Sequence, residues 1–397
     1  MTEVHVLLYS VVMYIKREIE DNFQKTLSSP KVTMVLGCRQ VGKTTLIKQQ
    51  LQDRAVFYNL DLESDKQIIT SASFLAPAEA IKNLGNHKII VFDEAQTLPE
   101  IGQIAKGWFD AGLPTKIILT GSSSLNLLNK SAESLTGRNQ KLFLPPLLFQ
   151  EILASQSWYP NFLNEKVVTD RFPRQVETIL MQAVIFGSYP EVVLSDSRQE
   201  LLANLASDYL IKDILQEGLV KDPNLIRKLL MLLAHQVGAE VSVNELANNL
   251  STTRITVDRY LNLLEQTFVI FRLPAYSSNP RKEISKNQKI YFWDTGIRNA
   301  ILNDFSQNPL RSDVGALWEN WVVAEFAKQN LLAGQQKNLY FWRSKAGSEV
   351  DLVIKENENL KAFEIKWQKK STIQKAFKRK YGIKVEVINK DKPIFRI

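Results

Sequence analysis

The sequence has few side chains that cross-link or bind transition metals, with one cysteine and three histidines among 397 residues. The single cysteine, Cys38, excludes an internal disulfide and is typical of a reducing compartment. So few cysteines and histidines also exclude the usual zinc clusters. The longest apolar run near the start, residues 4–12, is too short to span a bilayer.

These absences predict a soluble, cytoplasmic protein with no membrane partner. No basic residue precedes residues 4–12 and no small-residue cleavage site follows, so a signal peptide is not predicted. Met13 is a second plausible start, which makes residues 1–12 an extension. With 45% hydrophobic and 23% charged residues, the chain is predicted to be globular, and its length favours about two to four domains.

Basic residues are concentrated in the last third of the chain. Residues 1–280 hold 27 Lys or Arg against 29 Asp or Glu, whereas residues 281–397 hold 23 against 13. Within that last third, residues 366–370 and 375–381 interleave basic and aromatic side chains. A basic surface attracts the phosphate backbone of nucleic acids. The pattern therefore favours a nucleic-acid partner, and the alternative is an ordinary solvated helix face.

The strongest motif lies near the N-terminus. Residues 31–36 predict a buried strand, residues 37–44 match the P-loop pattern G-x-x-x-x-G-K-[ST], and residues 45–50 predict a helix whose N-terminus faces an anion. In this motif the backbone N–H groups surround a phosphate, the lysine reaches the β and γ oxygens, and the hydroxyl binds Mg²⁺. The predicted ATP-binding residues are Gly37, Cys38, Arg39, Gln40, Val41, Gly42, Lys43, Thr44 and Thr45.

Two further strands support a nucleotide site. The apolar run 88–92 ends in Asp93 and Glu94, the Walker B pattern, so Asp93 is predicted to hold Mg²⁺ and Glu94 to polarise the attacking water. Residues 116–120 predict a third strand, whose carboxyl end lies at the edge of a parallel sheet where ligands bind. Ser122 is predicted to sense that water, with Thr120 and Ser123 as the alternatives.

The stretches GCRQVGKTTL, KIIVFDEAQ, KIILTGSSS and LTGR resemble those of the AAA-type ATPases. Together with GSYPEVV, KIYFWDTGIRNAI, LWENWVVAEF and GSEVDLVI…AFEIKW, in this order, they resemble a prokaryotic branch with a C-terminal restriction-endonuclease-like region. This resemblance implies that Arg138 is an arginine finger or sensor for a γ-phosphate. The alternative for Arg138 is a salt bridge that closes its loop.

The middle of the chain predicts helices followed by a helix-turn-helix. Residues 146–235 carry apolar residues at helical spacing and predict a lid over the nucleotide. Residues 241–265 predict two helices joined by a tight turn, and two strands flank the basic loop 277–288, so residues 236–300 read as a winged helix. Its predicted DNA contacts are Thr252, Thr253, Arg254, Arg259, Arg281, Lys282 and Lys286; the alternative is a packing or docking module.

The segment 347–367 predicts a β-hairpin, because apolar and polar residues alternate on both sides of a turn at 356–359. This register pairs Asp351 with Glu364, and like charges directly opposite each other destabilise a sheet. A divalent cation between them offsets the repulsion. The alternative is a solvated face with a different register.

The same region resembles the PD-(D/E)XK nucleases. Residues 317–326 predict an amphipathic helix that presents Glu319 and Glu325. By the resemblance, Glu319, Asp351 and Glu364 bind Mg²⁺ or Mn²⁺, and Lys366 positions or stabilises the nucleophile.

The predicted fold is α/β in four parts: a P-loop AAA-type core at 1–145, a helical lid at 146–235, a winged helix at 236–300 and a nuclease-like domain at 301–397. The predicted function is an ATPase with catalytic residues Glu94, Lys43 and Arg138, coupled to a metal-dependent DNA nuclease that uses Lys366. Two alternatives remain: a nucleotide-switched DNA-binding regulator with a silent nuclease-like domain, and a protein-interaction module. A finger acting between subunits also predicts a homo-oligomer.

Overall fold

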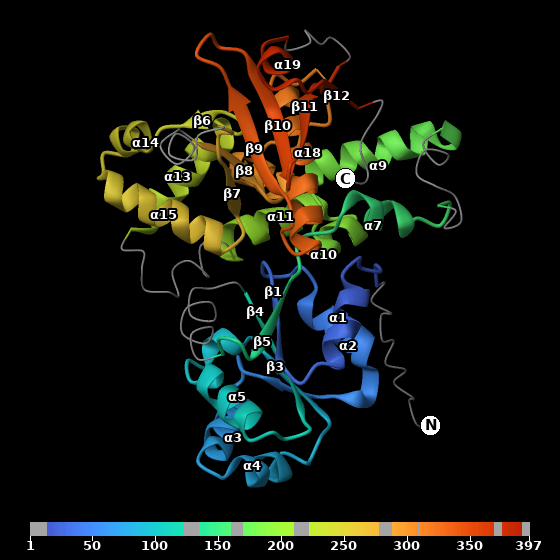
Figure 1. Ribbon diagram of the computed structural model, residues 1–397, viewed down its shortest axis with the longest axis vertical. Helices are drawn as coiled ribbons and strands as arrows, with labels where there is room; N and C mark the ends of the chain where they lie inside the picture. Colours follow the sequence, from blue (N-terminus) through green and yellow to red (C-terminus); the bar gives the residue numbers. More distant parts are fainter. Residues whose placement is uncertain are drawn as a thin grey trace, which may run out of the picture.

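The computed structural model places the N-terminal sheet and its helices in one half of the molecule and the remaining elements in the other (Figure 1). Five predicted features, Met13 as a start and the side chains of Ser123, Arg281, Lys282 and Lys286, lie outside the described residues. The structure describes residues 14–122, 135–159, 170–209, 222–277, 288–308, 310–368 and 375–390.

Five parallel strands form the N-terminal sheet, in the order β2-β3-β4-β1-β5. The three strands predicted from the sequence are present, and each of them is largely buried because helices cover both faces. The strands are β1 (Val32–Leu36), β2 (Val56–Asn59), β3 (Ile89–Asp93), β4 (Lys116–Gly121) and β5 (Asn139–Phe143).

Alternate residues of these strands pack on different helices. Val35 and Ile118 pack with α1 (Glu20–Leu27) and α2 (Lys43–Leu51), whereas Met34 and its neighbours on the other face pack with α3, α4 and α5. This arrangement is the three-layer sandwich that a buried parallel sheet requires. The second set of helices is α3 (Glu63–Ser73), α4 (Pro77–Asn83) and α5 (Ile101–Asp110).

The described part of the predicted lid is helical. Three of its helices have proline in their first turn, where the missing N–H costs no hydrogen bond. The Asp222 side chain also caps the last helix by accepting from the backbone N–H groups of Asn224 and Leu225. The helices are α7 (Phe149–Ala154), α9 (Pro173–Phe186), α10 (Pro190–Leu194), α11 (Arg198–Asn204) and α13 (Pro223–His235).

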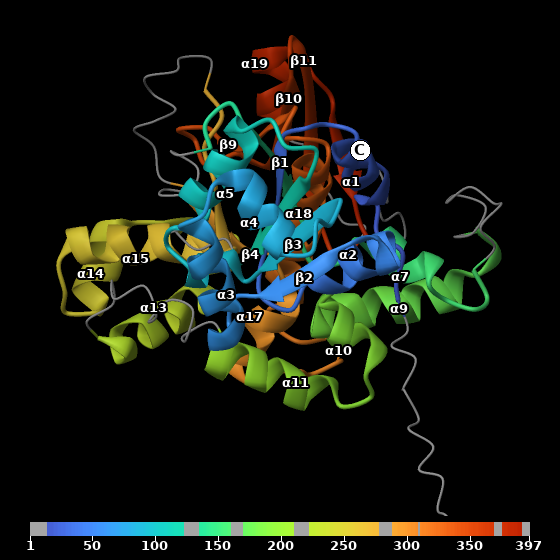
Figure 2. The same ribbon diagram turned by 90° about the horizontal axis from the view of Figure 1, so that it is seen from below.

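The two helices and two strands predicted after the lid are present. The helices are α14 (Val243–Asn249) and α15 (Arg254–Gln266), and Thr253 caps the second through a bond from Thr256 N of 3.2 Å. An antiparallel sheet in the order β6-β8-β7 has its first strand before α14 and the other two after α15, and α17 (Thr295–Leu302) follows them. Figure 2 shows α14 and α15 on the opposite side of the molecule from α7 and α9. The strands are β6 (Glu240–Val241), β7 (Ile270–Leu273) and β8 (Gln288–Phe292).

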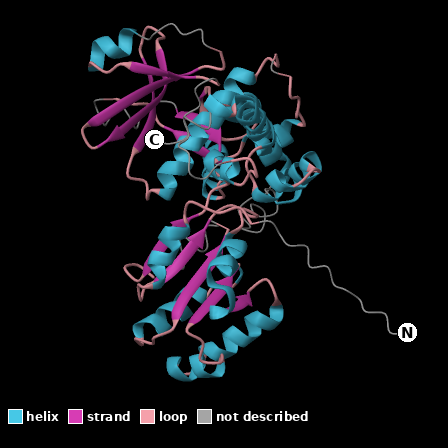
Figure 3. Cartoon of the chain, turned by 90° about the vertical axis from the view of Figure 1, so that its right-hand side faces the viewer, coloured by secondary structure: helices cyan, strands magenta, loops and turns pink. Residues whose placement is uncertain are grey.

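The C-terminal part contains α18 (Val314–Leu332) and a four-stranded sheet in the order β12-β11-β10-β9. Figure 3 shows this sheet well separated from the five-stranded sheet, with helices between them. The strands β9, β10 and β11 are antiparallel, and β12 joins β11 in parallel. Their bounds, with the helix between the last two, are β9 (Asn338–Arg343), β10 (Glu349–Glu356), β11 (Asn359–Ile365), α19 (Lys375–Tyr381) and β12 (Val385–Ile388).

The predicted hairpin register is confirmed, because Leu352 pairs with Phe363 and each later pair follows in step as far as Glu356 and Asn359. The predicted alternation is wrong at one position. Val350 packs with Val353, on the face opposite to Leu352. The reason is a register shift between β10 and β9 that falls between Val350 and Val353, since a bulge turns the following residues to the other face.

The prediction of an amphipathic helix at 317–326 is also wrong. Every residue from Asn320 to Lys328 in α18 is buried, so no face of this stretch is open to solvent. Its side chains belong to one apolar core that also contains Val41 of the P-loop and Leu352 of the hairpin. The helix is buried all round because segments distant in the sequence pack on each of its sides.

Candidate functional site

The P-loop connects the end of β1 to the start of α2, as the sequence predicts. Gly42 and Gln40 have positive φ values of 91° and 60°, which curl the loop around its centre. At Gly37 a Cβ atom would lie 2.2 Å from the carbonyl oxygen of Leu144, so only glycine fits there. The backbone thus requires both motif glycines.

Lys43 lies at the centre of the curled loop. Its side chain is buried, and its Nζ donates to the carbonyl oxygens of Gly37 at 3.1 Å and Cys38 at 2.8 Å. This is the place where the P-loop lysine meets the β and γ oxygens of a nucleotide. Cys38, in contrast, turns away from the loop centre, and its Sγ lies 3.6 Å from the carbonyl oxygen of Phe268.

The two Walker residues meet across neighbouring elements. Thr44 Oγ1 lies 2.8 Å from Asp93 Oδ2, and Thr120 donates to the other carboxylate oxygen of Asp93. A hydroxyl beside a carboxylate is a donor set that Mg²⁺ accepts, so these residues fit the ion. Thr120, rather than the buried Ser122, is the β4 side chain that the structure bonds to Asp93.

Glu94 follows Asp93 in a strained conformation. Its φ is 51°, in the left-handed region that costs a non-glycine residue free energy. The Glu94 N–H donates to Thr120 Oγ1 at 3.4 Å, and Gln96 donates to the Glu94 carboxylate. This backbone turn directs Glu94 into the cavity beside the P-loop.

A cavity of about 810 Å³ lies against the P-loop, within the size range of ligand pockets. Three segments form its walls: the P-loop, the residues before α1, and the start of α10. Sequence reasoning assigned no role to the last two, although the GSYPEVV stretch that begins α10 was recognised as a motif. The lining residues that it missed are Tyr14, Ile15, Arg17, Leu147, Pro190, Glu191, Leu194 and Ser195.

Arg17, in the residues before α1, bonds to the P-loop and to the start of the lid. Its guanidinium donates to Glu151 Oε2 at 3.1 Å, to the Val41 carbonyl at 2.9 Å and to the Pro145 carbonyl at 2.6 Å. The Arg17 and Glu151 side chains are only 3% and 4% exposed. Arg17 therefore holds the P-loop against the start of the lid.

Arg138 forms an ion pair with Asp110, with Nε 2.6 Å from Oδ1, and it does not line the P-loop cavity of its own chain. Both side chains are about two-fifths exposed. The ion pair corresponds to the structural alternative for Arg138. The finger role remains a prediction, because it requires a second subunit.

The opposed carboxylates of the hairpin share a lysine. Lys366 Nζ lies 3.3 Å from Asp351 Oδ2 and 3.4 Å from Glu364 Oε1. Asp351 also accepts from the Ile365 N–H at 2.7 Å. Burial alone would lower the pKa of Lys366, but Asp351 and Glu364 outweigh it and raise that pKa above its ordinary value.

Glu319 meets a second lysine, which the sequence did not single out. Lys289 Nζ lies 2.9 Å from Glu319 Oε1 and 2.5 Å from Glu349 Oε1, and the Tyr291 hydroxyl donates to Glu319 at 2.6 Å. Burial raises the pKa of Glu319, against Lys289, which lowers it. We call the group of Glu319, Glu349, Asp351 and Glu364 the acidic cluster.

A divalent ion at the acidic cluster would require several carboxylate oxygens at once. In the part of the chain that the structure describes, no three Asp, Glu, His or Cys side chains are placed to hold a metal ion. Lysine ammonium groups bridge the carboxylates instead. In this arrangement the cluster does not fit the predicted metal. Glu325 lies elsewhere and bonds to Phe149 N and Lys328.

Among the predicted DNA contacts, Thr252 and Thr253 precede α15, Arg254 begins it and Arg259 lies near its middle. Thr253, Arg254 and Arg259 are exposed, and Thr252 is half-buried. Thr253 serves as the helix cap, and Arg254 pairs with Asp258 at 3.5 Å.

In the described residues, no helix is both long enough and apolar enough to cross a membrane.

Residues 29–153 match the family described as an AAA domain. Residues 177–308 match a domain of unknown function, DUF8612, and residues 314–393 match another, DUF4143. The first of these two spans most of the predicted lid and the whole predicted winged helix. The family matches therefore divide the chain into three units.

Relatives match along most of the chain. An uncharacterized protein of Mycobacterium tuberculosis is 26% identical over 363 residues, covering 90% of this chain and 75% of the relative. One of Methanocaldococcus jannaschii is 28% identical over 348 residues, covering 83% and 74%. Among solved structures, a Walker-type ATPase of Pyrococcus abyssi has a TM-score of 0.51 at 15% identity, covering 73% of this chain and 96% of that one. At this identity the likeness shows a shared P-loop ATPase fold.

Proposed function

We propose that this AAA-type P-loop protein binds and hydrolyses ATP and transmits its nucleotide state to the C-terminal region. The P-loop N–H groups and Lys43 would hold the phosphates, and Thr44 and Asp93 would hold Mg²⁺. When bound, Mg²⁺ neutralises charge that develops on the phosphate oxygens. Tyr14, Ile15 and Leu194 supply the apolar part of the cavity, where the base packs.

Glu94 is the residue that orients the attacking water. Its carboxylate borders the cavity, and its backbone conformation is fixed by the bond from Glu94 N to Thr120. Thr120 in turn bonds to Asp93, so one hydroxyl links both acids of the Walker B pair. This linkage supports Thr120, the predicted alternative to Ser122, as the side chain that senses the attacking water.

One observation carries the proposed transmission: α18 bonds to the wall of the nucleotide cavity and also contributes to the acidic cluster. Lys328 Nζ donates to the carbonyl oxygen of Leu147, a cavity residue, at 3.1 Å. Glu325 on the same helix accepts from Phe149 N at 2.9 Å. Glu319, less than two turns earlier, bonds to Lys289. A shift of the wall on nucleotide binding therefore acts directly on this helix.

The start of α10 is tied to the same helix. Ser188 accepts from Lys328 Nζ at 2.8 Å, and the Ser188 N–H donates to Asp294 Oδ2 at 2.7 Å. Ser188 precedes Pro190, which lines the cavity. Through Ser188, the buried side chains of Asp294 and Lys328 thus connect the lid to α17 and α18.

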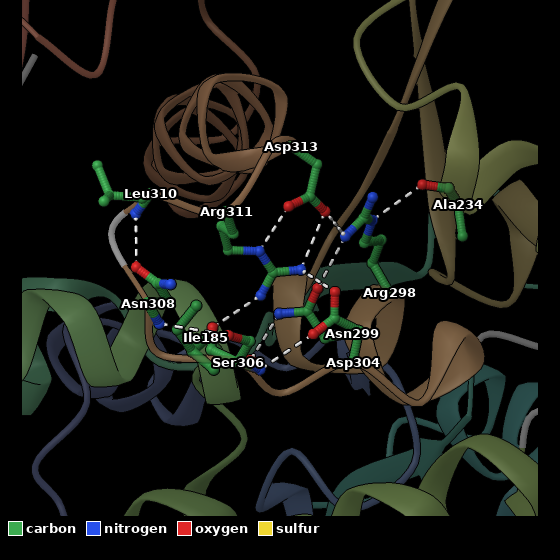
Figure 4. A network of polar contacts seen from close by, with 10 residues as sticks. All are labelled: Ile185, Ala234, Arg298, Asn299, Asp304, Ser306, Asn308, Leu310, Arg311 and Asp313. Atoms are coloured by element: carbon green, nitrogen blue, oxygen red, sulfur yellow. Dashed lines mark hydrogen bonds and ion pairs between the residues drawn. The ribbon is translucent and has the colours of Figure 1, made fainter.

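The first turn of α18 is also fixed (Figure 4). Asp313, just before the helix, accepts from Arg298 at 2.6 Å and from Arg311 at 3.0 Å. Arg298 also donates to the Ala234 carbonyl at the end of α13, at 2.9 Å. Because both ends of α18 are anchored, the helix is suited to move as one body with the lid.

The geometry favours the function of a regulator whose nuclease-like region is catalytically silent. The order of α18, three antiparallel strands, α19 and a parallel β12 supports the nuclease-like fold. The lysines that bridge the acidic cluster favour the silent alternative over the metal-dependent nuclease. The exposed Arg254 and Arg259 on α15 support DNA as a ligand of the winged-helix-like part.

Variants of the nucleotide site test the first part of the proposal. Lys43→Ala should abolish binding of a fluorescent ATP analogue, whereas Glu94→Gln should bind it and lose turnover, because the carboxylate aligns water without holding the nucleotide. Lys48→Ala, an exposed lysine on the same helix α2, is the matched control and should behave like the parental protein. Parental turnover in Glu94→Gln contradicts its assigned role.

The transmission is tested by hydrogen exchange across β10 and β11 in the Glu94→Gln protein, with and without ATP. ATP should change the exchange of this hairpin if α18 carries the nucleotide state. Lys328→Met should remove that change while ATP still binds, because it breaks the bonds to Leu147 and Ser188. An unchanged ATP response in Lys328→Met rules out this route.

A further inference from the structure

Lys289 places its ammonium between two carboxylates of the acidic cluster. Its side chain is 3% exposed, and its Nζ bridges Glu319 and Glu349. The same ammonium lies 5.6 Å from the centre of the Phe341 ring, which closes its apolar side. Lys289 belongs to β8, so this cation is delivered by the three-stranded sheet to carboxylates of α18 and β10.

The contacts around Lys289 leave little room for movement. Tyr291, also on β8, donates to Glu319 Oε1 at 2.6 Å. A Cβ atom at Gly238 would lie 3.2 Å from the same oxygen, and the Gly238 N–H donates to Ile290 O in β8 at 3.3 Å. Arg343 of β9 adds a bond to Glu240 of β6 at 2.9 Å. The three-stranded sheet and the residues next to it therefore contact Glu319 and β9 at several points.

The charges of the cluster fall into two sets. Lys366 forms ion pairs with Asp351 and Glu364, and Lys289 forms ion pairs with Glu319 and Glu349. Each set contains two carboxylates and one ammonium. Because like charges at this distance repel, removal of Lys366 leaves Asp351 and Glu364 without this counter-ion, and removal of Lys289 leaves Glu319 without it and Glu349 with the more distant Arg343 at 4.0 Å.

We propose that Lys289 is the resident cation of the acidic cluster and excludes a divalent metal from it. The ion pairs of Lys289 then hold the three-stranded sheet against the four-stranded sheet. This inference goes beyond the proposed ATPase, because it concerns a site that shares no residue with the P-loop cavity. It gives a specific reason for a silent nuclease-like region.

The test is to remove the charge of Lys289 and keep its apolar stem. Lys289→Met should lower the melting temperature in metal-free buffer, because Glu319 loses its counter-ion and Glu349 keeps the more distant Arg343 at 4.0 Å. Millimolar Mn²⁺ should then raise the melting temperature of this variant by at least about 2 °C, since an ion that binds only the folded state stabilises it. Without nucleotide, the parental protein should show a smaller rise, and Mn²⁺ electron paramagnetic resonance should detect one more bound ion in the variant than in the parental protein, because the Thr44 and Asp93 site is common to both.

Three variants serve as controls. Lys337→Met removes a more exposed pair with Glu356 at 3.8 Å and should create no Mn²⁺ response. Lys289→Met with Glu319→Gln should lose the gained response, because one ligand is gone. If Lys289→Met does not fold, adding Glu349→Gln removes one negative charge and should restore folding; a failure to restore it overturns the proposal.

Two other results overturn the inference. A Mn²⁺-dependent rise in the parental protein that Lys289→Met leaves unchanged shows that the lysine does not occupy the ion's place. A folded Lys289→Met protein without any Mn²⁺ response shows that the cluster has no cation position. ATP-analogue binding is measured in the same samples and should be unaffected, so a failure of the ATPase proposal is seen separately.

Discussion

Arg17→Met is expected to destabilise the folded chain strongly, although Arg17 precedes every recognised motif. The side chain donates three hydrogen bonds, to Glu151, Val41 and Pro145. Removing one partner of a buried ion pair costs about 3–5 kcal/mol, because the other charge stays buried. Backbone N–H groups of Leu148 and Glu18 still donate to Glu151, so the free energy of unfolding is expected to fall by about 3 kcal/mol, the lower end of this range.

Urea unfolding at neutral pH measures this loss. The matched control is Arg54→Met, whose side chain bonds to the carbonyls of Leu51 and Gln50 in its own segment and should cost less than about 0.5 kcal/mol. The double variant Arg17→Met with Glu151→Leu should cost less than the sum of the two single changes, because no unpaired charge remains. A loss below about 1 kcal/mol for Arg17→Met, or simple additivity, refutes the reasoning.

Three further predictions concern the P-loop and Arg138. Gly37→Ala should abolish binding of the ATP analogue, because its Cβ would overlap Leu144 O, whereas Gly107→Ala, with open space around it, should bind normally. Burial raises the pKa of Cys38 to about 11, so alkylation at pH 8 should be about 100-fold slower in the folded protein than in urea and should accelerate with pH; equal rates contradict this. Mixed Arg138→Ala and Lys43→Ala subunits should regain ATPase activity if Arg138 acts in trans, and a strict monomer with concentration-independent turnover excludes it.

The sequence predicted those parts of the molecule that depend on local order. The P-loop forms as expected because its motif prescribes a strand, a loop and a helix with little freedom. Thr44 meets Asp93, 49 residues later, because parallel strands bring their carboxyl ends to one edge of the sheet. The hairpin register followed from counting outward from its turn, since the pairs on both strands are fixed once the turn is known. The register places Leu352 opposite Phe363, and Asp351 and Glu364, each one position further out, both contact Lys366.

The remaining features depend on segments that are far apart in the sequence. Arg17 meets Glu151 across 134 residues, and Lys328 meets Leu147 across 181. Lys289 gave no signal, because an isolated lysine in a strand is indistinguishable from a surface lysine until α18 is placed beside it. The apolar residues of α18 were read as one stripe because their partners on the other sides could not be identified.

The closed packing of α18 has a consequence for how the gene product can be divided. Trp321 lies against Phe149 of the lid, with ring centres 5.3 Å apart, and Trp318 stacks within 5.3 Å of Trp321. If the polypeptide were cut ahead of α18, Phe149 would lie on the surface of the N-terminal fragment, and Trp318 and Trp321 on that of the C-terminal fragment. Such apolar patches promote aggregation. The two fragments would each lack the other's half of the shared core. Genetic complementation by separately expressed fragments therefore depends on their docking through α18 while they fold.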